Sequence, residues 1–404
     1  MAVGRCEFPE IREIKGVRLG AADAGLMRTD RDDLVAIELA PGSRVAAVFT
    51  RNAFCAAPVL LARKHLSGSP RWLLVNSGNA NAGTGEEGLD DALATCSSLA
   101  ELVDANAGDV LPFSTGVIGE PLPAKKITRA LPAAIRVLSA DGWAQAATAI
   151  MTTDTFPKGA SRSICLAGRV ISISGIAKGA GMIHPDMATM LAFVATDAAV
   201  DRPCLQQCLE RVVNQSFNRI TVDGDTSTND ACVLMATGAS GGPDITADSP
   251  EFDAFAQAVS EVCGELAESI VRDGEGATKL IRICVEGAAS EGEAHQVAKT
   301  IAHSPLVKTA FFASDPNWGR ILAAVGRAGI DDLDISRVSI WLDDVSIVQG
   351  GGRAPGYSEA AGQAVMAAEE IVVRVCLGRG DSTVRILTCD FSYDYVRINA
   401  EYRT

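Results

Sequence analysis

The chain has 404 residues, of which 48% are hydrophobic and 21% are charged, so it is long enough for two or three domains of about 150 residues. Its formal net charge is −14, which argues against proteins that bind a phosphate backbone or an anionic membrane through positive charge. No apolar run approaches the roughly 18 residues that span a bilayer, and residues 1–16 lack the apolar stretch of a signal peptide. We therefore expect a cytoplasmic protein with no nucleic-acid or membrane partner.

Strand-like and helix-like segments alternate in the first half of the chain. Strands are predicted over residues 34–39, 44–50 and 71–78, and an amphipathic helix over residues 89–105. A further pair of strands, 169–177 and 189–196, brackets a loop that contains glycine and proline. This part of the chain is therefore predicted to be mixed α and β.

Two helices, 202–216 and 251–271, are predicted on either side of a polar stretch. The longer helix has apolar residues at steps of three and four, which places them on one buried face. Beyond residue 280, strands are predicted over 281–287, 338–349 and 383–391, and helices over 294–304 and 358–376. We therefore predict a larger domain over residues 1–280 and a smaller α+β domain over residues 281–404.

Metal and nucleotide sites have little support in the sequence. The eleven cysteines include no CxxC pair, which predicts reduced, mostly buried thiols. The four histidines include no HExxH, and Cys204 and Cys208 lie four residues apart without a second pair, so no metal site is predicted. The glycines after Lys178 follow a strand, but His184 and Pro185 stand where a phosphate-binding helix would begin.

Threonine-rich segments are the next candidates, at 114–119, 151–156 and 187–191. Threonine is common in strands because its side chain branches at Cβ, so a structural role is the simplest interpretation of each segment. Thr189 stands out because the small Ala188 precedes it and Pro185 restricts the loop before it. A strained loop favours an acyl shift from nitrogen to oxygen, and hydrolysis of the ester would free a threonine whose own amine can act as a base.

Five long motifs give a more specific indication. They are VNSGNANAGTG (75–85), STGVIG (114–119), KGAGMIHPDMATML (178–191), SFNRITVDGDTSTND (216–230) and SDPNWGRILAA (314–324). In this order they resemble the ornithine acetyltransferase family, the bifunctional glutamate N-acetyltransferases of arginine biosynthesis. The resemblance extends from about Gly16 to Thr404.

The resemblance implies that the precursor cuts itself between Ala188 and Thr189. An α chain would end at Ala188, and a β chain would begin with Thr189 as the nucleophile and acetylated residue. The oxyanion hole of the family falls on Thr115 and Gly116, where donors would meet the charge on the carbonyl oxygen.

The substrate-binding positions implied by the resemblance are Thr155, Lys178, Thr189, Glu275, Asn399 and Thr404. The cationic Lys178 suits an α-carboxylate, and the anionic Glu275 suits an ammonium, as a site for N-acetylornithine requires. His184 and Asp186 depart from the family, which often carries alanine and asparagine there, and Gly83 stands where cysteine is frequent. We expect Asp186 to alter the rate of self-cleavage, and we assign no catalytic role to His184 because the threonine amine already supplies a base.

The implied fold is a mixed α/β sandwich with sheets between helix layers, plus the smaller C-terminal domain. The implied reaction is ping-pong: Thr189 takes the acetyl group of N-acetyl-L-ornithine and passes it to L-glutamate. No cofactor is implied, although some family members also accept acetyl-CoA as a substrate. The family suggests an assembly of two α and two β chains.

Two alternatives remain open at this point. One is a related self-cleaving aminopeptidase or amidase, in which water takes the acyl group. The matching Lys178, Glu275 and Asn399 argue against it. The other is an uncleaved acidic binding protein, against which the intact Ala188–Thr189 junction and the STG motif argue.

Overall fold

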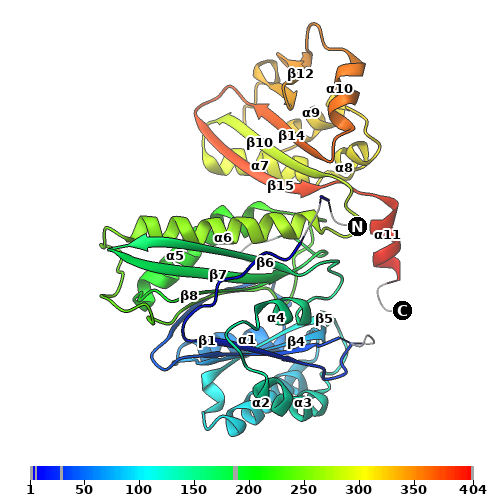
Figure 1. The fold of residues 1–404 in the computed structure, drawn as a ribbon. Coiled ribbons are helices and arrows are strands. Elements are labelled where there is room, and N and C mark those ends of the chain that lie inside the picture. The colour runs from blue at the N-terminus through cyan, green and yellow to red at the C-terminus, as the bar shows by residue number, and fades with distance from the viewer. Residues whose placement is uncertain (1–2, 5–6, 28–30, 185–189, 402–404) are drawn as a thin grey trace. The chain divides into compact units, whose positions relative to one another are not determined.

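The protein is described by a computed structural model that covers residues 3–4, 7–27, 31–184 and 190–401 (Figure 1). The chain divides into two compact units. The larger unit comprises residues 7–218 and 225–270, and the smaller unit comprises residues 1–6, 219–224 and 271–404. Within the described residues, every helix is too short or too polar to cross a membrane.

Two stacked sheets form the centre of the larger unit. The four-stranded sheet has the order β1 (Val17–Ala22), β2 (Leu34–Leu39), β4 (Trp72–Asn79) and β5 (Val110–Val117). The five-stranded sheet has the order β3 (Arg44–Phe49), β9 (Ala231–Ala236), β8 (Leu191–Thr196), β7 (Arg169–Lys178) and β6 (Lys158–Leu166). Each sheet contains one parallel pair, β4 with β5 and β8 with β9, and its other pairs are antiparallel.

The main core of the larger unit lies between these sheets, because alternate residues of their strands point into the same layer. Phe113 of β5 and Phe193 of β8 meet there edge to face, with ring centroids 5.2 Å apart. Trp143 of helix α4 (Trp143–Ala149) is buried in the same cluster. The helices that join the parallel pairs cover the outer faces, as right-handed crossovers require.

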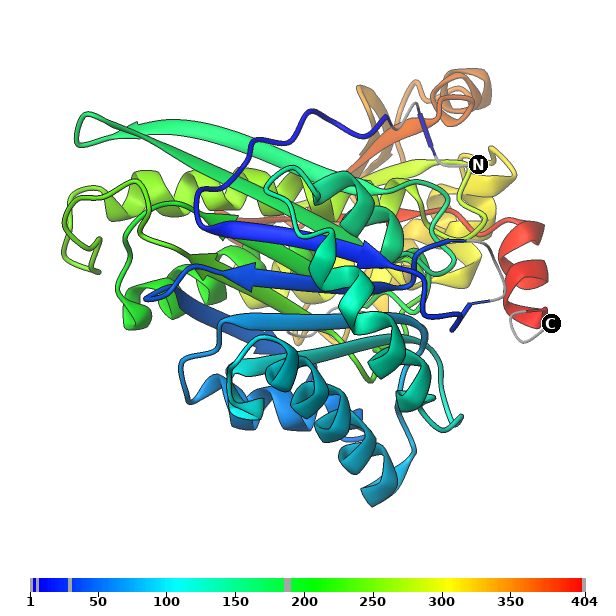
Figure 2. The same ribbon diagram turned by 60° about the horizontal axis from the view of Figure 1, so that its bottom comes forward.

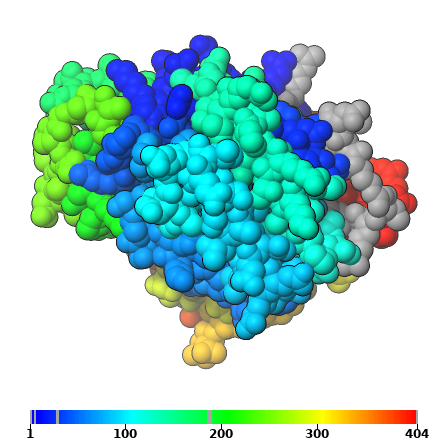
Figure 3. Space-filling view, turned by 90° about the horizontal axis from the view of Figure 1, so that it is seen from below, coloured from blue at the N-terminus to red at the C-terminus, as the bar shows by residue number. Residues whose placement is uncertain are grey.

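The four-stranded sheet is covered by α1 (Ala57–Leu66), α2 (Gly85–Leu102) and α3 (Ala124–Arg136). Figure 2 shows these helices along the outer face of the sheet, and Figure 3 shows that side chains of α2 and α3 cover that face. The five-stranded sheet is covered by α5 (Arg202–Gln215) and α6 (Phe252–Arg272). The predicted sandwich, with sheets between helix layers, is therefore confirmed.

The smaller unit contains a six-stranded sheet. Its order is β13 (Gly352–Arg353), β12 (Val345–Gln349), β11 (Ser339–Leu342), β14 (Glu370–Cys376), β10 (Leu280–Ala288) and β15 (Ser382–Cys389). Its helices are α7 (Glu291–Ala302), α8 (Pro305–Phe312), α9 (Trp318–Gly326), α10 (Glu359–Met366) and α11 (Tyr393–Ala400). One apolar cluster joins the sheet to α7, α8, α9 and α10.

Two predictions in this unit were wrong. The strand expected over residues 338–349 is a hairpin of β11 and β12, which turns at Asp343 with a positive φ of 46°. The helix expected over residues 358–376 ends at Met366, and its second half is strand β14. Ile371, Val373 and Val375 alternate there with less buried residues, so the period is two and not 3.6.

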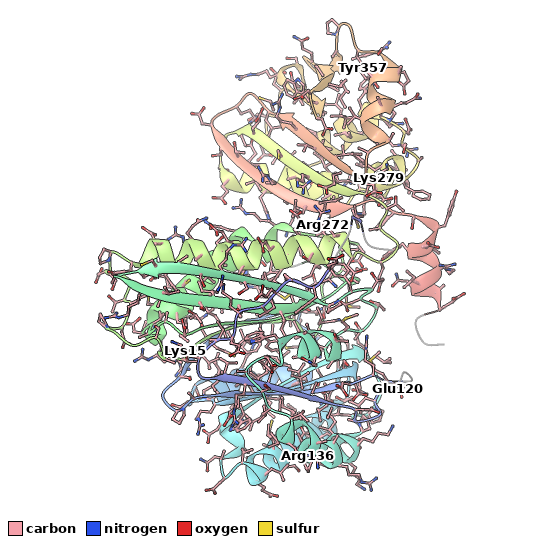
Figure 4. All side chains as sticks on the ribbon, in the orientation of Figure 1. Lys15, Glu120, Arg136, Arg272, Lys279 and Tyr357 are labelled. Atoms are coloured by element: carbon pink, nitrogen blue, oxygen red, sulfur yellow. The ribbon has the colours of Figure 1, made fainter. Side chains whose placement is uncertain are left out.

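The structure places the boundary between the units at residue 270, ten residues before the expected position. The segment after α6 is tied to the end of β15, because Asp390 accepts hydrogen bonds from the backbone N–H groups of Thr278 and Lys279, each at 2.8 Å. The ammonium of Lys279, which is labelled in Figure 4, donates to the carbonyl oxygens of Met366 and Ala368. Because of these bonds, the segment after α6 belongs to the smaller unit.

Candidate active site

The parallel pair β4 and β5 brings two of the sequence motifs side by side. Ser77 pairs with Thr115, and Gly78 pairs with Gly116. Gly116 has a φ of 133°, and a Cβ atom added to it would lie 2.3 Å from the carbonyl carbon of Gly78. Only glycine fits this close approach of two backbones. Near the end of β5, the backbone of Gly116 in the STG motif therefore has no side chain to cover it.

The TND segment before β9 connects the two sheets. Asn229 donates hydrogen bonds to the carbonyl oxygens of Ala80 (2.6 Å) and Ser114 (2.9 Å). Ser114 donates in turn to the side-chain oxygen of Asn76 at 2.6 Å. Because these polar groups are buried, they need partners inside the protein, and the network fixes the ends of β4, β5 and β9 relative to one another.

Lys178 lies at the end of β7 and contacts β5 and the segment before β6. Its Nζ atom donates to the hydroxyl oxygens of Thr152 (2.7 Å) and Thr115 (3.1 Å). Lys178 also pairs in register with Leu191 at the start of β8, two residues after Thr189. The structure thus brings together Lys178 and Thr115, two of the residues that the resemblance implies.

Asp154 lies beside Lys178 and is completely buried with Lys158, whose Nζ atom is 2.7 Å from Asp154 Oδ1. The same oxygen accepts from the backbone N–H of Gly179 at 2.7 Å, and Oδ2 accepts from that of Thr152 at 3.0 Å. Burial alone would raise the pKa of this carboxyl. The charges of Lys158 and Lys178 outweigh burial and hold the pKa well below its usual range. Asp154 is therefore ionised.

Asp230 is a second buried carboxyl in this region. It directly precedes Ala231, whose N–H donates to the carbonyl oxygen of Met190 at 2.9 Å. Burial raises the pKa of Asp230 well above its ordinary value, against the opposing effects of hydrogen bonds from Ser227 and the charge of Lys178. Among the described residues, Asp230 Oδ2 has no hydrogen-bond partner. Asp230 therefore holds its proton more strongly than an exposed aspartate does.

In the smaller unit, the structure brings together Glu275 and Asn399. The side-chain amide of Asn399 donates to Glu275 Oε2 at 2.8 Å, and Glu275 is buried. Glu275 follows the end of α6 in the DGEG turn, where Ser392 donates to the carbonyl oxygen of Gly276 at 2.5 Å. A carboxylate held in this way can accept from an ammonium group.

The remaining predicted residues are placed as follows. Thr155 is exposed next to Asp154, in the segment that leads to β6. Ala188, Thr189 and Thr404 lie outside the described residues. The carbonyl oxygen of His184 accepts from the Thr226 hydroxyl at 3.3 Å.

The cysteine pair on α5, Cys204 and Cys208, is buried. Burial with the charge of Asp201 raises the pKa of Cys204 to about 11. The thiol of Cys204 therefore stays protonated near neutral pH. All ten cysteines within the described part of the chain are free thiols.

Sequence analysis missed the polar residues that surround Lys178, namely Thr152, Asp154, Lys158 and Asp230. The signal for Asp154 and Lys158 was their spacing of four residues, with opposite charge, at the start of a strand. Asp154 lies in the threonine-rich segment 151–156, but no role is assigned to it there, and burial of the pair depends on the tertiary fold.

Comparison with known proteins gives a consistent result. The family model described as the ArgJ family matches residues 18–404. The "Arginine biosynthesis bifunctional protein ArgJ" of Methylococcus capsulatus is 67% identical over 391 residues, which cover 97% of this chain and 96% of that protein. The protein of the same name from Pseudomonas syringae pv. tomato is 56% identical over 405 residues and covers 100% of both chains.

A solved structure is also similar to this chain. The crystal structure of the arginine biosynthesis bifunctional protein argJ from Bacillus halodurans is 44% identical to it, with a TM-score of 0.51. The match covers 99% of the solved chain and 52% of this one. The solved chain is therefore about half as long as this sequence.

Proposed function

This chain belongs to the ArgJ family, and on that premise we propose that it transfers an acetyl group from N-acetyl-L-ornithine to L-glutamate. The transfer is ping-pong through an acetyl ester on Thr189, after self-cleavage between Ala188 and Thr189. The relatives are named bifunctional, so we further propose that acetyl-CoA serves as a second acetyl donor for glutamate. The enzyme is then both a glutamate N-acetyltransferase and an amino-acid N-acetyltransferase of arginine biosynthesis.

The observation that carries this proposal is the contact between Lys178 and Thr115. An ammonium group has only donors, so the Thr115 oxygen accepts a hydrogen bond from Lys178. The hydroxyl proton of Thr115 therefore points away from Lys178 and can be donated to another acceptor. A binding group for a carboxylate and a donor for an oxyanion therefore meet at one place. Leu191, two residues after the nucleophile in the sequence, pairs with Lys178 at the start of β8.

The first half-reaction begins when the Thr189 hydroxyl attacks the acetyl carbonyl of acetylornithine, with the Thr189 amine as the base. The Thr115 hydroxyl and the Gly116 N–H stabilise the oxyanion that forms. The C–N bond of the amide breaks, the proton passes to the leaving nitrogen, and ornithine departs. The acetyl group stays on Thr189 as an ester.

In the second half-reaction, the amine of glutamate attacks this ester, and the Thr189 oxygen takes back a proton. Both substrates carry an α-carboxylate, so Lys178 can bind the donor and the acceptor in turn. Glu275, held by Asn399, is proposed to bind the side-chain ammonium of acetylornithine, and Thr155 and Thr404 to contribute further substrate contacts.

Self-processing has separate support. The solved relative matches 52% of this chain over 99% of its own length, and 216 of the 404 residues here follow Ala188. A chain of that length is expected if the precursor is cut near its middle. We propose that two α and two β chains assemble in the cytoplasm.

The experiment that tests the proposed function varies the acceptor. Acetylornithine and glutamate together should give ornithine and acetylglutamate in equal amounts, with the parallel-line kinetics of a ping-pong reaction. Acetate release at a rate that does not depend on glutamate would identify an aminopeptidase or amidase instead.

A further inference from the structure

Asp154 and Lys158 form a buried ion pair that the proposed chemistry does not use. Their side chains expose no surface, and Lys158 Nζ also lies 4.8 Å from the centroid of the Phe156 ring. The desolvation of a buried ion pair costs about as much free energy as the attraction between the two charges contributes. Apolar replacements of similar volume are therefore often neutral or stabilising. Stability alone therefore does not explain the presence of this pair.

The other bonds of Asp154 connect the two chain segments that hold Lys178. One carboxylate oxygen accepts from the backbone N–H of Gly179, which directly follows Lys178. The other accepts from the backbone N–H of Thr152, whose hydroxyl accepts from Lys178 Nζ at 2.7 Å. Asp154 thus fixes the backbone beside Lys178 and the residue that contacts its ammonium.

Gly179 makes this bond in an unusual backbone conformation. Its φ is 148°, which side chains rarely adopt, and a Cβ atom added to it would lie 3.0 Å from Ile183 Cδ1. The bond to Asp154 holds the backbone in this conformation where β7 ends. Lys158 supplies the countercharge that a carboxylate needs in the interior.

We propose that Asp154, with Lys158 as its countercharge, is a positioning residue that fixes the Lys178 ammonium where the α-carboxylates of both substrates bind. This inference rests on the proposed function of Lys178. It gives Asp154 and Lys158 no contact with the substrates, because the pair is completely enclosed. Loss of the pair is therefore expected to weaken substrate binding, and to do so only by displacing Lys178.

The decisive variant replaces both members of the pair, Asp154→Leu with Lys158→Met. Asp154→Asn alone would leave a buried ammonium without its countercharge and is expected to destabilise the protein. The double variant should fold, but with a lower unfolding temperature than the wild type, because the N–H groups of Gly179 and Thr152 lose their acceptor. The KM for acetylornithine and the KM for glutamate should both rise, by about tenfold or more, since a small misplacement of a binding group is costly.

A matched control is available in the same unit. Arg44 and Asp244 form a solvent-exposed ion pair of 2.6 Å. Arg44→Met with Asp244→Leu should leave both KM values unchanged.

A second measurement separates positioning from a structural role. In the Lys178→Ala background, the double variant should cause no further rise in either KM, because the pair acts through Lys178. Additive effects, unchanged KM values in the double variant, or a double variant that does not fold would each overturn the proposal. A wild-type enzyme that transfers no acetyl group would instead refute the proposed function, and the two failures are thus distinguishable.

Discussion

The Nζ atom of Lys178 lies 3.1 Å from the hydroxyl oxygen of Thr115, although 63 residues separate the two in the chain. Lys178 ends strand β7 of the five-stranded sheet, and Thr115 lies in β5 of the four-stranded sheet. The contact therefore crosses from one sheet of the sandwich to the other. It joins a cation that suits a substrate carboxylate to a hydroxyl that suits an oxyanion.

Self-cleavage predicts two fragments. Division of 42.1 kDa in proportion to 188 and 216 residues gives about 20 and 22 kDa, and the larger fragment should begin Thr-Met-Leu-Ala-Phe. Thr189→Ala should remain a single inactive chain, because the hydroxyl is needed for the acyl shift and for the transfer. Mass spectrometry and N-terminal sequencing test both statements. An intact wild-type chain, or normal processing of Thr189→Ala, would contradict them.

Lys178→Ala should lower kcat/KM for both substrates. Loss of a charge-assisted hydrogen bond costs roughly 1.5 to 3 kcal/mol, which is about ten- to a hundredfold in kcat/KM. Steady-state kinetics with each substrate varied in turn will measure the effect. Lys125→Ala, at an exposed position on α3, is the control and should behave as the wild type. An effect on only one substrate would exclude a shared carboxylate site.

Glu275→Gln should act selectively on the donor. Acetylornithine has a side-chain ammonium and glutamate does not, so the KM for acetylornithine should rise about tenfold or more while that for glutamate changes little. Asn399→Ala should also raise the KM for acetylornithine, but by a smaller factor, because it removes only the hydrogen bond that orients Glu275. Glu369→Gln, an exposed carboxylate of the same unit, is the control. Equal effects on both substrates would count against this role.

Asp230→Asn should be more stable than the wild type, and the difference in the free energy of unfolding should grow as the pH rises. The folded state holds the Asp230 proton more tightly than the unfolded state, because its pKa is raised. The wild type therefore loses stability as the pH rises from about 4 toward the raised pKa, by about 1.4 kcal/mol for each pH unit, and asparagine does not titrate.

Urea unfolding between pH 5 and pH 8 will measure this difference. The comparison is best made in the Thr189→Ala background, where both proteins should be single chains. A stability difference that shrinks as the pH rises would contradict the raised pKa of Asp230.

Local patterns predicted about half of the helices and strands described in the larger unit. The strands that became β2, β3, β4 and β7, and the helices α5 and α6, follow from periods of two and 3.6 residues within short segments. The segment 358–376 was predicted incorrectly because its alanine-rich start favours a helix, while the strand pattern of its end covers only seven residues. A short period-two pattern is easily attributed to the helix before it.

The motifs alone indicated the family and the candidate residues, because each motif is contiguous in the chain and includes the side chains that carry its chemistry. Three features could be seen only in the folded chain: Lys178 contacts Thr115 and Thr152, Asn229 links two sheets, and Asp154 is buried with Lys158. These contacts depend on the order and register of strands that are distant in the chain. The pattern within one segment indicates the secondary structure and the buried face of that segment. It does not indicate which other segment will pack beside it.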